Sequence, residues 1–168
     1  MNILITRPLI DAEDLMGKLF SLGHKIINIP TLKITSTNMS PINPNNYDAF
    51  IFTSANAFRN LNVERLDKNK FCFCVGAITE KIVRHSGYLN TISAGGTVNA
   101  LKNLIMSSNK INFNSNIAYF CGDNLTSDLD LELKKERLKV EKIVNYSSDK
   151  IIDLNEENKK IIENHPPD

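Results

Sequence analysis

Short apolar runs alternate with amphipathic stretches along most of this chain, and each run ends in a small polar turn. Four such runs stand out, at Ile3–Pro8, Ala49–Ala57, Cys72–Thr79 and Ile117–Asn124. Each has the length of a buried strand and leads into apolar residues at helical spacing. Strands that alternate with helices predict an α/β fold, with a parallel sheet and helices on both faces. The turns after such strands gather at one edge, where ligands bind.

A polar segment divides this pattern in two. Residues 35–46 are almost entirely Ser, Thr, Asn and Pro and have no periodicity, so we expect a linker there. Residues 1–34 before it supply only two strands and a helix, and two strands do not make a stable sheet alone. Residues 47–146 supply enough strand–helix units for a complete flavodoxin-like domain. We therefore expect a two-domain plan whose first domain, begun by residues 1–34, is incomplete.

The predicted elements follow from apolar spacing and from punctuation by glycine and proline. The chain is expected to form strands at 3–6, 25–29, 50–53, 71–75, 89–93, 117–121 and 139–146. It is expected to form helices at 12–22, 55–61, 78–86, 97–106, 127–137 and 155–164. Gly23 and Gly87 stand where helices should end, as C′ glycines usually do.

Composition excludes several classes of protein. The 168 residues are 42% hydrophobic and 23% charged with a net charge of +1, so the chain can bury a core but has no basic block for nucleic acid. No apolar run approaches the roughly 20 residues of a membrane span, and we expect no signal peptide, because Ile3–Ile5 is too short for its apolar region. The cysteines Cys72, Cys74 and Cys121 are odd in number and lack C-x-x-C spacing, which favours buried thiols in the cytoplasm over zinc or a redox pair.

The turn after the second of these runs carries the sharpest local signal. Thr53, Ser54 and Asn56 lie where a strand becomes a helix, between small alanines. Their hydroxyl and amide groups and the helix N-terminus suit an anionic ligand such as a carboxylate. The alternative is that Ser54 only caps the helix. Because no Gly-x-Ser-x-Gly motif is present, a hydrolase nucleophile is not indicated.

The next turns repeat the arrangement with different residues. Gly76 and Thr79 follow one strand, and Gly122 follows another. None of these turns is a P-loop or a G-x-G-x-x-G motif, so dinucleotide binding is not supported. Capping remains the alternative for Gly76 and Thr79.

Two further side chains are candidates for chemistry. Arg7 ends the first strand and could bind a carboxylate through two hydrogen bonds, or it could be an ordinary surface residue. Tyr146 ends the last strand, where its phenol could enter a cleft as a donor or weak acid, or could simply pack on a neighbour. The three histidines have no partner at metal-site or acid–base spacing, so no metal is expected.

Taken together, these stretches resemble the uroporphyrinogen-III synthase family from Met1 to about Tyr146. Each motif is weak alone, but their order and spacing are much more specific. The resemblance lies in LITRP, Leu22-Gly23-His24, Pro30–Ile34, IFTSANA, FCVGAIT, Gly96-Thr97, YFCGDN and VEKIVNYSS. It implies two flavodoxin-like α/β domains joined by a two-stranded linker. The chain would start the first domain, build the whole second domain at 47–146, and return to the first.

The resemblance also implies an activity. The family is a cyclising lyase of porphyrin and heme biosynthesis, which converts the linear tetrapyrrole hydroxymethylbilane to uroporphyrinogen III with loss of water and inversion of ring D. It implies no cofactor and no metal, and a monomer that could receive its substrate from hydroxymethylbilane synthase. By motif, Tyr146 matches the tyrosine that assists departure of the hydroxyl. Thr79 and Ser54 match cleft residues, Arg7 is carried over more loosely, and Thr53, Asn56, Gly76 and Gly122 are expected beside them.

The C-terminal segment departs from the family pattern. The resemblance implies several further strands of the first domain, whereas residues 147–168 supply a return linker and one candidate helix. We therefore expect a truncated first domain. Two functions stay open: a uroporphyrinogen-III synthase, or a non-catalytic remnant or tetrapyrrole-binding module. A flavin-binding module is not supported, because no glycine-containing phosphate loop follows the first strand.

Overall fold

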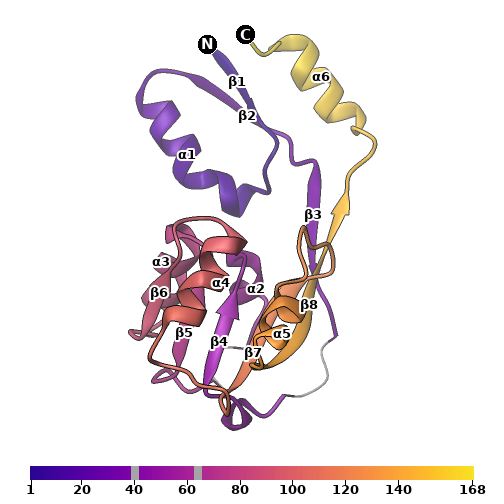
Figure 1. The fold of residues 1–168 in the computed structure, drawn as a ribbon. Coiled ribbons are helices and arrows are strands. Elements are labelled where there is room, and N and C mark those ends of the chain that lie inside the picture. The colour runs from indigo at the N-terminus through magenta and orange to yellow at the C-terminus, as the bar shows by residue number, and fades with distance from the viewer. Residues whose placement is uncertain (39–41, 63–65) are drawn as a thin grey trace. The chain divides into compact units, whose positions relative to one another are not determined.

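The computed structural model describes residues 1–38, 42–62 and 66–168. It divides the chain into two compact units. One contains Met1–Thr35 with Ser148–Asp168, and the other contains Ser36–Ser147. Figure 1 shows the elements of each unit. No helix in the described parts is both long and apolar enough to cross a membrane.

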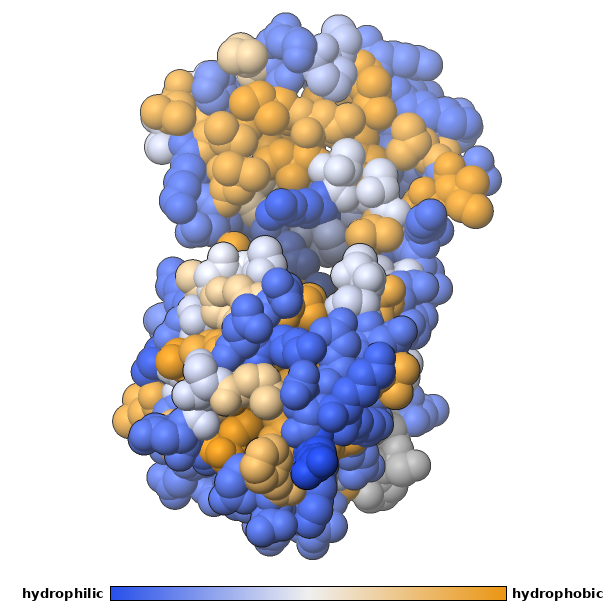
Figure 2. Space-filling view, viewed as in Figure 1, coloured by the Kyte–Doolittle hydropathy of each residue, from blue (hydrophilic) through white to orange (hydrophobic). Residues whose placement is uncertain are grey.

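The first unit holds a parallel pair of strands, β1 (Asn2–Ile5) and β2 (Lys25–Asn28), joined by α1 (Leu9–Ser21). Helix α6 (Glu156–Asn164) belongs to the same unit. Helix α1 begins before the predicted residue 12, because Pro8 stands at the N-cap with a φ of −48° and admits a helix directly after it. Large apolar side chains remain exposed in this unit, as Figure 2 shows.

The second unit contains most of a six-stranded sheet. Its strands lie in the order β3-β8-β7-β4-β5-β6. They are β3 (Leu32–Ser36), β4 (Ala49–Phe52), β5 (Phe71–Cys74), β6 (Thr91–Ser93), β7 (Asn116–Gly122) and β8 (Lys139–Lys150). The helices are α2 (Ala55–Arg59), α3 (Ala77–His85), α4 (Val98–Ser107) and α5 (Leu129–Lys135).

The pairs from β8 through β7, β4 and β5 to β6 are all parallel, which confirms the predicted α/β class. Counted from β4 in chain order, these strands lie 3-2-1-4-5 across the sheet, whereas flavodoxin has the order 2-1-3-4-5. The comparison with flavodoxin therefore holds for the layers but not for the strand order. The chain reverses its direction across the sheet between β4 and β7.

Helices cover both faces of this sheet because its central strands are apolar on both sides. Helices α2 and α3 pack on one face, around the rings of Phe50, Phe52 and Phe120. Helices α4 and α5 pack on the other, around Ile51 and Tyr119. All three cysteines are buried and free, as predicted.

Part of the segment that was expected to be an irregular linker has regular structure. Residues 35–36 belong to β3, and Pro44–Asn46 form a 3-10 helix, while 39–41 lie outside the described residues. The last strand also runs beyond Tyr146 to Lys150. Backbone bonds explain both results, because the Thr37 amide donates to the Asn145 carbonyl (3.2 Å) and the Ile151 amide to the Thr31 carbonyl (2.9 Å). Polar side chains do not prevent a strand when its backbone has a partner.

Candidate functional site

The carboxyl ends of β7, β4 and β5 lie side by side, because these strands are adjacent and parallel. Their turns therefore share one edge of the sheet. β4 and β7 also flank the point where the strand order reverses, and ligands of open α/β sheets bind in the crevice outside such a point. The candidate residues of the second unit belong to this edge.

Thr53 ends β4 and meets a residue that sequence analysis did not identify. Its Oγ1 lies 3.2 Å from the Tyr119 hydroxyl, and Tyr119 is 1% exposed. Burial raises the pKa of Tyr119 to about 12, and the Thr53 hydrogen bond offsets part of that rise. Because Tyr119 lies inside an apolar strand, the sequence pattern indicates only a core ring. Its hydroxyl fixes Thr53 on the α4/α5 face of the sheet.

Ser54 and Asn56 begin the short helix α2. The Ser54 hydroxyl accepts the Asn56 amide at 3.1 Å, so the capping interpretation holds for Ser54. The Asn56 Oδ1 accepts the Arg59 guanidinium at 3.0 Å. A serine that accepts in a cap still has its own proton to donate, so capping does not remove Ser54 from a binding site.

Gly76 and Thr79 begin α3. Gly76 is the N-cap, with no side-chain cap bond and an ordinary extended φ of −153°. A Cβ there would come no closer than 3.5 Å to Gly96, so space does not require the glycine. Thr79 is 5% exposed, so its side chain is buried rather than open to a cleft.

Gly122 is the last residue of β7, and it pairs with Tyr146 of β8. Tyr146 is half-buried and packs against the aromatic cluster of the α2/α3 face. Its ring lies directly on the backbone of Gly122. Among the described residues, no hydrogen bond engages its hydroxyl, so the phenol at this edge keeps a proton to donate.

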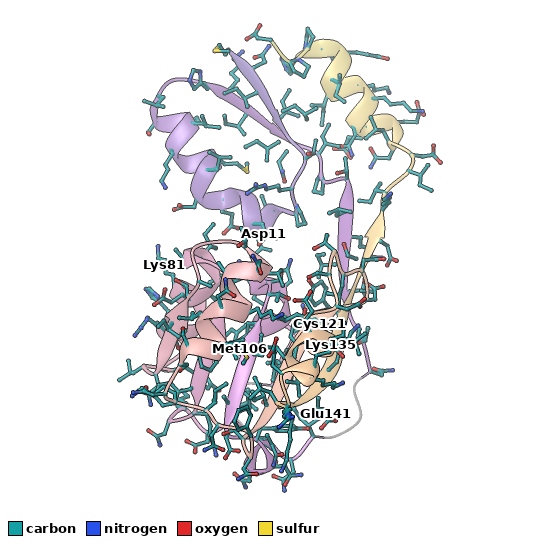
Figure 3. The ribbon with its side chains drawn as sticks, in the orientation of Figure 1. Asp11, Lys81, Met106, Cys121, Lys135 and Glu141 are labelled. Atoms are coloured by element: carbon teal, nitrogen blue, oxygen red, sulfur yellow. The ribbon has the colours of Figure 1, made fainter. Side chains whose placement is uncertain are left out.

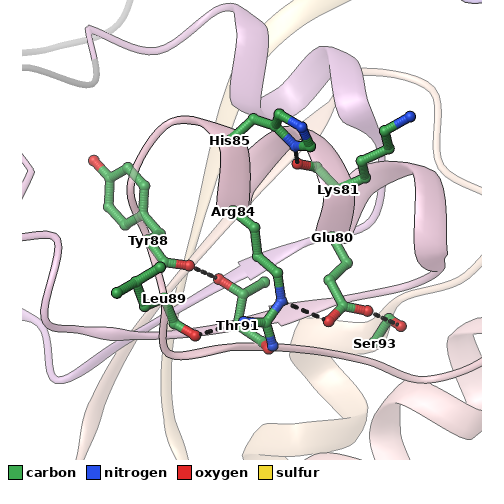
Figure 4. Close-up of polar contacts among 8 residues, drawn as sticks. All are labelled: Glu80, Lys81, Arg84, His85, Tyr88, Leu89, Thr91 and Ser93. Atoms are coloured by element: carbon green, nitrogen blue, oxygen red, sulfur yellow. Dashed lines mark hydrogen bonds and ion pairs between the residues drawn. The ribbon is translucent and has the colours of Figure 1, made fainter.

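An ion-pair network that sequence analysis missed lies on α3 (Figure 4). The Arg84 Nε is 2.8 Å from Glu80 Oε1, and Ser93 donates to the other carboxylate oxygen. The Ser93 bond and then the Arg84 bond hold the pKa of Glu80 below its usual range. Arg84 also donates to the carbonyls of Leu89 (2.8 Å) and Thr91. The i,i+4 spacing of Glu80 and Arg84 was the available sequence signal.

We expect Arg84→Ala to lower the free energy of unfolding by about 1–3 kcal/mol, because two backbone carbonyls and one oxygen of the Glu80 carboxylate lose their donor. Lys81→Ala on the same helix is the matched control, since Lys81 is exposed, and should change stability by less than about 0.5 kcal/mol. Urea unfolding followed by circular dichroism measures both. Equal effects of the two substitutions would contradict a structural role for the network.

The remaining candidates and hollows lie elsewhere. Arg7 belongs to the first unit and is exposed, and its carbonyl accepts the Asn28 side chain at 3.0 Å. A hollow of about 640 Å³ in the second unit, lined in part by Phe71 and Thr91, lies at the opposite, amino end of the strands. The described part of the chain contains no cluster of His, Cys, Asp and Glu fit for a metal ion.

Figure 3 draws the side chains as sticks and labels Cys121 and Glu141 of this unit. Cys121 lies in β7, one residue before Gly122, and Glu141 lies in β8, where its carboxylate accepts the Tyr47 hydroxyl at 2.6 Å. The buried carboxylate of Asp130 pairs with Lys134 at 3.2 Å. Most charged groups of this unit thus have structural partners, and the candidate edge itself carries hydroxyls rather than an acid–base pair.

Comparison with known proteins identifies the family. The model of the family "Uroporphyrinogen-III synthase HemD" matches residues 13–168. No curated protein sequence matches the chain. Two solved structures share its fold: uroporphyrinogen-III synthetase from Helicobacter pylori (TM-score 0.57, 17% identity, 86% of this chain and 62% of that one) and a mutant uroporphyrinogen III synthase from Thermus thermophilus (TM-score 0.57, 15% identity, 90% and 64%).

The chain therefore spans less than two thirds of the length of these two relatives. Their identity is too low to carry residue roles, but their fold agrees with the family match. The family match covers far more than half of the chain and agrees with the order of motifs read from the sequence. This chain belongs to the uroporphyrinogen-III synthase family.

Proposed function

We propose that this chain takes part in the uroporphyrinogen-III synthase reaction, the cyclisation of hydroxymethylbilane with loss of water and inversion of ring D. Family membership supports the proposal. The observation that carries it is the Tyr146 phenol, which packs on Gly122 at the end of β7, one of the two strands that flank the reversal of strand order, with no hydrogen-bond partner among the described residues. In this proposal Tyr146 is the proton donor of the reaction.

The proposed reaction needs only one acid–base group from the protein. The lone pair of a pyrrole nitrogen of the substrate expels the terminal hydroxyl, and the Tyr146 phenol gives that oxygen a proton, so it leaves as water. The resulting azafulvene is attacked by the α-carbon of ring D that already carries the bridge to ring C. The bond from that carbon to the bridge then breaks, and the bridge re-forms its bond to the other α-carbon of ring D, which inverts the ring. The proton lost from this second carbon on rearomatisation restores the phenol. Carboxylates of the substrate bind Thr53, Ser54 and the backbone of Gly76, at the start of α3. Holding the chain of rings in one conformation supplies most of the rate.

The proposal extends to the setting of the reaction. A monomer in the cytoplasm receives hydroxymethylbilane from its synthase, and the reaction needs no cofactor. Asn56 contributes a further hydrogen bond to a substrate carboxylate, and the first turn of α3 at Thr79 closes one side of the site. Arg7 of the first unit remains a predicted carboxylate-binding residue.

The test couples the purified chain to a source of hydroxymethylbilane and separates the uroporphyrinogen isomers. Type III isomer above the enzyme-free control supports the proposal. Type I isomer alone, as in the control, refutes catalysis by this chain. Since the chain spans under two thirds of its solved relatives, a non-catalytic tetrapyrrole-binding module is the second candidate. Type I product together with saturable binding of hydroxymethylbilane would support that alternative.

Ser54→Asp separates capping from substrate binding. Aspartate caps a helix as well as serine, so we expect stability to change by less than about 0.5 kcal/mol. Its charge repels substrate carboxylates, so KM should rise about tenfold, an effect of about 1.4 kcal/mol. Asn155→Asp, at the cap of α6 in the first unit, adds the same charge at a different cap and should leave KM unchanged. An unchanged KM for Ser54→Asp would remove Ser54 from the site.

A further inference from the structure

The pairing between β7 and β8 contains one irregular step, just before Tyr146. Cys121 pairs with Val144, but Gly122 pairs with Tyr146, so Asn145 is an extra residue on β8. In a regular ladder Gly122 would pair with Asn145. This is a β-bulge, a feature that changes the direction of the side chains that follow it.

The bulge decides on which face of the sheet the phenol stands. Before it, Ile143 packs on the α2/α3 face, and Val144 pairs with Cys121, which packs on the α4/α5 face. Regular alternation would send Asn145 to the first face and Tyr146 to the second. With the extra residue, Asn145 and Tyr146 both lie on the α2/α3 face: the Asn145 amide reaches α2, and the Tyr146 ring packs on the aromatic cluster.

Asn145 fixes the bulge to its surroundings. Its side chain is fully buried, and Nδ2 donates to the Ala57 carbonyl of α2 at 2.5 Å. Its own carbonyl accepts the Thr37 amide at 3.2 Å. The side-chain oxygen has no partner in the described part of the chain. If Asn145 only filled space in the core, an apolar residue would be more stable there, because a buried oxygen without a hydrogen bond costs free energy. The two bonds hold the bulged residue between α2 and the neighbouring segment.

Gly122 supplies the surface on which the ring rests. A Cβ at this position would lie 2.6 Å from Tyr146 Cζ, 2.8 Å from Cε2 and 2.9 Å from the hydroxyl oxygen. These separations are shorter than real Cβ contacts, so any side chain at 122 would displace the phenol. Gly122 is not among the glycines with positive φ. The glycine is therefore required by space and not by its backbone conformation.

We propose that Gly122 and Asn145 are positioning residues for the Tyr146 phenol. Asn145 holds the bulge that turns the ring to the α2/α3 face, and Gly122 leaves room for the hydroxyl end of that ring. This inference rests on the proposed function, in which Tyr146 protonates the leaving hydroxyl. Both residues act through Tyr146 and neither contacts substrate.

The first test does not depend on activity. The chain has four tyrosines, so labelling tyrosine with carbon-13 at Cζ gives four resonances, and Tyr146→Phe assigns one of them. In Gly122→Ala the Tyr146 resonance should shift while those of Tyr47, Tyr88 and Tyr119 stay, which also shows that the unit is folded. Gly17→Ala is the matched control, since a Cβ there meets nothing within 4 Å, and should leave all four resonances unchanged.

An unshifted Tyr146 resonance in folded Gly122→Ala would overturn the proposal. If Gly122→Ala does not fold, Asn145→Ala decides instead, because it removes the bond to Ala57 without adding volume beside the ring. The Tyr146 resonance should again move alone. A spectrum of Asn145→Ala identical to wild type would overturn the role of the bulge.

The second test measures the kinetics of the proposed reaction. Tyr146→Phe should lower kcat about 10²-fold, the low end for loss of a general acid. Gly122→Ala should lower kcat by a similar factor with KM within about twofold, and the double variant should be no slower than Tyr146→Phe. Additive losses would show that Gly122 acts independently of Tyr146 and would overturn the proposal. Full activity of Tyr146→Phe would refute the proposed role of the phenol in the reaction, whereas the resonance shifts test its positioning separately.

Discussion

Phe52→Ala is expected to lower the free energy of unfolding of the second unit by about 3–5 kcal/mol, the usual loss for an enclosed phenylalanine. Phe52 has no exposed surface. Its ring stacks on Phe120 with centroids 5.5 Å apart and meets Phe58 edge to face at 5.3 Å. Alanine would leave a cavity at the centre of the α2/α3 face and remove both ring contacts.

The cysteines make this measurement specific to one unit. All three thiols of the chain are buried in the second unit, so their labelling in native buffer reports the opening of that unit alone. A loss of 3–5 kcal/mol should raise the labelling rate roughly 10²–10³-fold or more when opening is a fast equilibrium. Phe113→Ala is the matched control, because Phe113 is 63% exposed in the same unit. Equal labelling rates for the two variants would contradict a central role for Phe52.

The strands of the second unit were predictable because each is an apolar run bounded by polar residues. Ala49–Phe52 and Phe71–Cys74 differ by one residue from the predicted ends, and both are buried along nearly their whole length. A strand that is buried on both faces is apolar along its whole length, so a short continuous apolar run is the expected sequence signal for it. The same reasoning placed the turns after β4, β5 and β7 at one edge, as their parallel pairing confirms.

Helix ends were less predictable because local backbone geometry decides them. The predicted helix at 127–137 is observed only at Leu129–Lys135. Arg137 has a φ of 65°, a left-handed conformation that ends a right-handed helix. An arginine side chain gives no sequence signal for this conformation. Helix α2 likewise ends at Arg59, before the predicted residue 61.

Only part of the candidate site could be predicted from local sequence, because other parts depend on contacts between distant residues. The polarity of Thr53 and Ser54 indicates their place at the edge, but the bond from Thr53 to Tyr119 joins residues 66 positions apart. The bulge at Asn145 depends on pairing with β7, on a carbonyl of α2 and on the room left by Gly122. Sequence periodicity carries local information, whereas a register shift is a property of two strands together. The order of motifs nevertheless identified the family.

Alkaline pH should destabilise the second unit steeply between about pH 10 and 12. Burial, reinforced for Tyr47 by the bond and charge of Glu141, raises the pKa of Tyr47, Tyr88 and Tyr119 from 10 to about 12. In this window the unfolded chain releases these protons and the folded chain keeps them. The contribution of the three phenols to stability is therefore fully present below pH 10 and falls as pH rises, by up to about 1.4 kcal/mol per pH unit for each phenol, or about 4 kcal/mol per pH unit for all three.

Urea midpoints measured by circular dichroism across pH 9–12 test this slope, with phenolate absorbance recorded on the same samples. Tyr119→Phe should remove roughly one sixth of the slope between pH 10 and 12, because it deletes one of six groups, three phenols and three thiols, whose pKa is raised by burial. Burial raises the pKa of Cys121 to about 11, that of Cys72 to about 12 and that of Cys74 further still, so the three thiols contribute in the same direction from about pH 9. Ionisation of the three phenols at pH 10 in the folded chain, with flat stability, would show that their rings are open to water and that both faces of the sheet are packed more loosely than their buried side chains indicate.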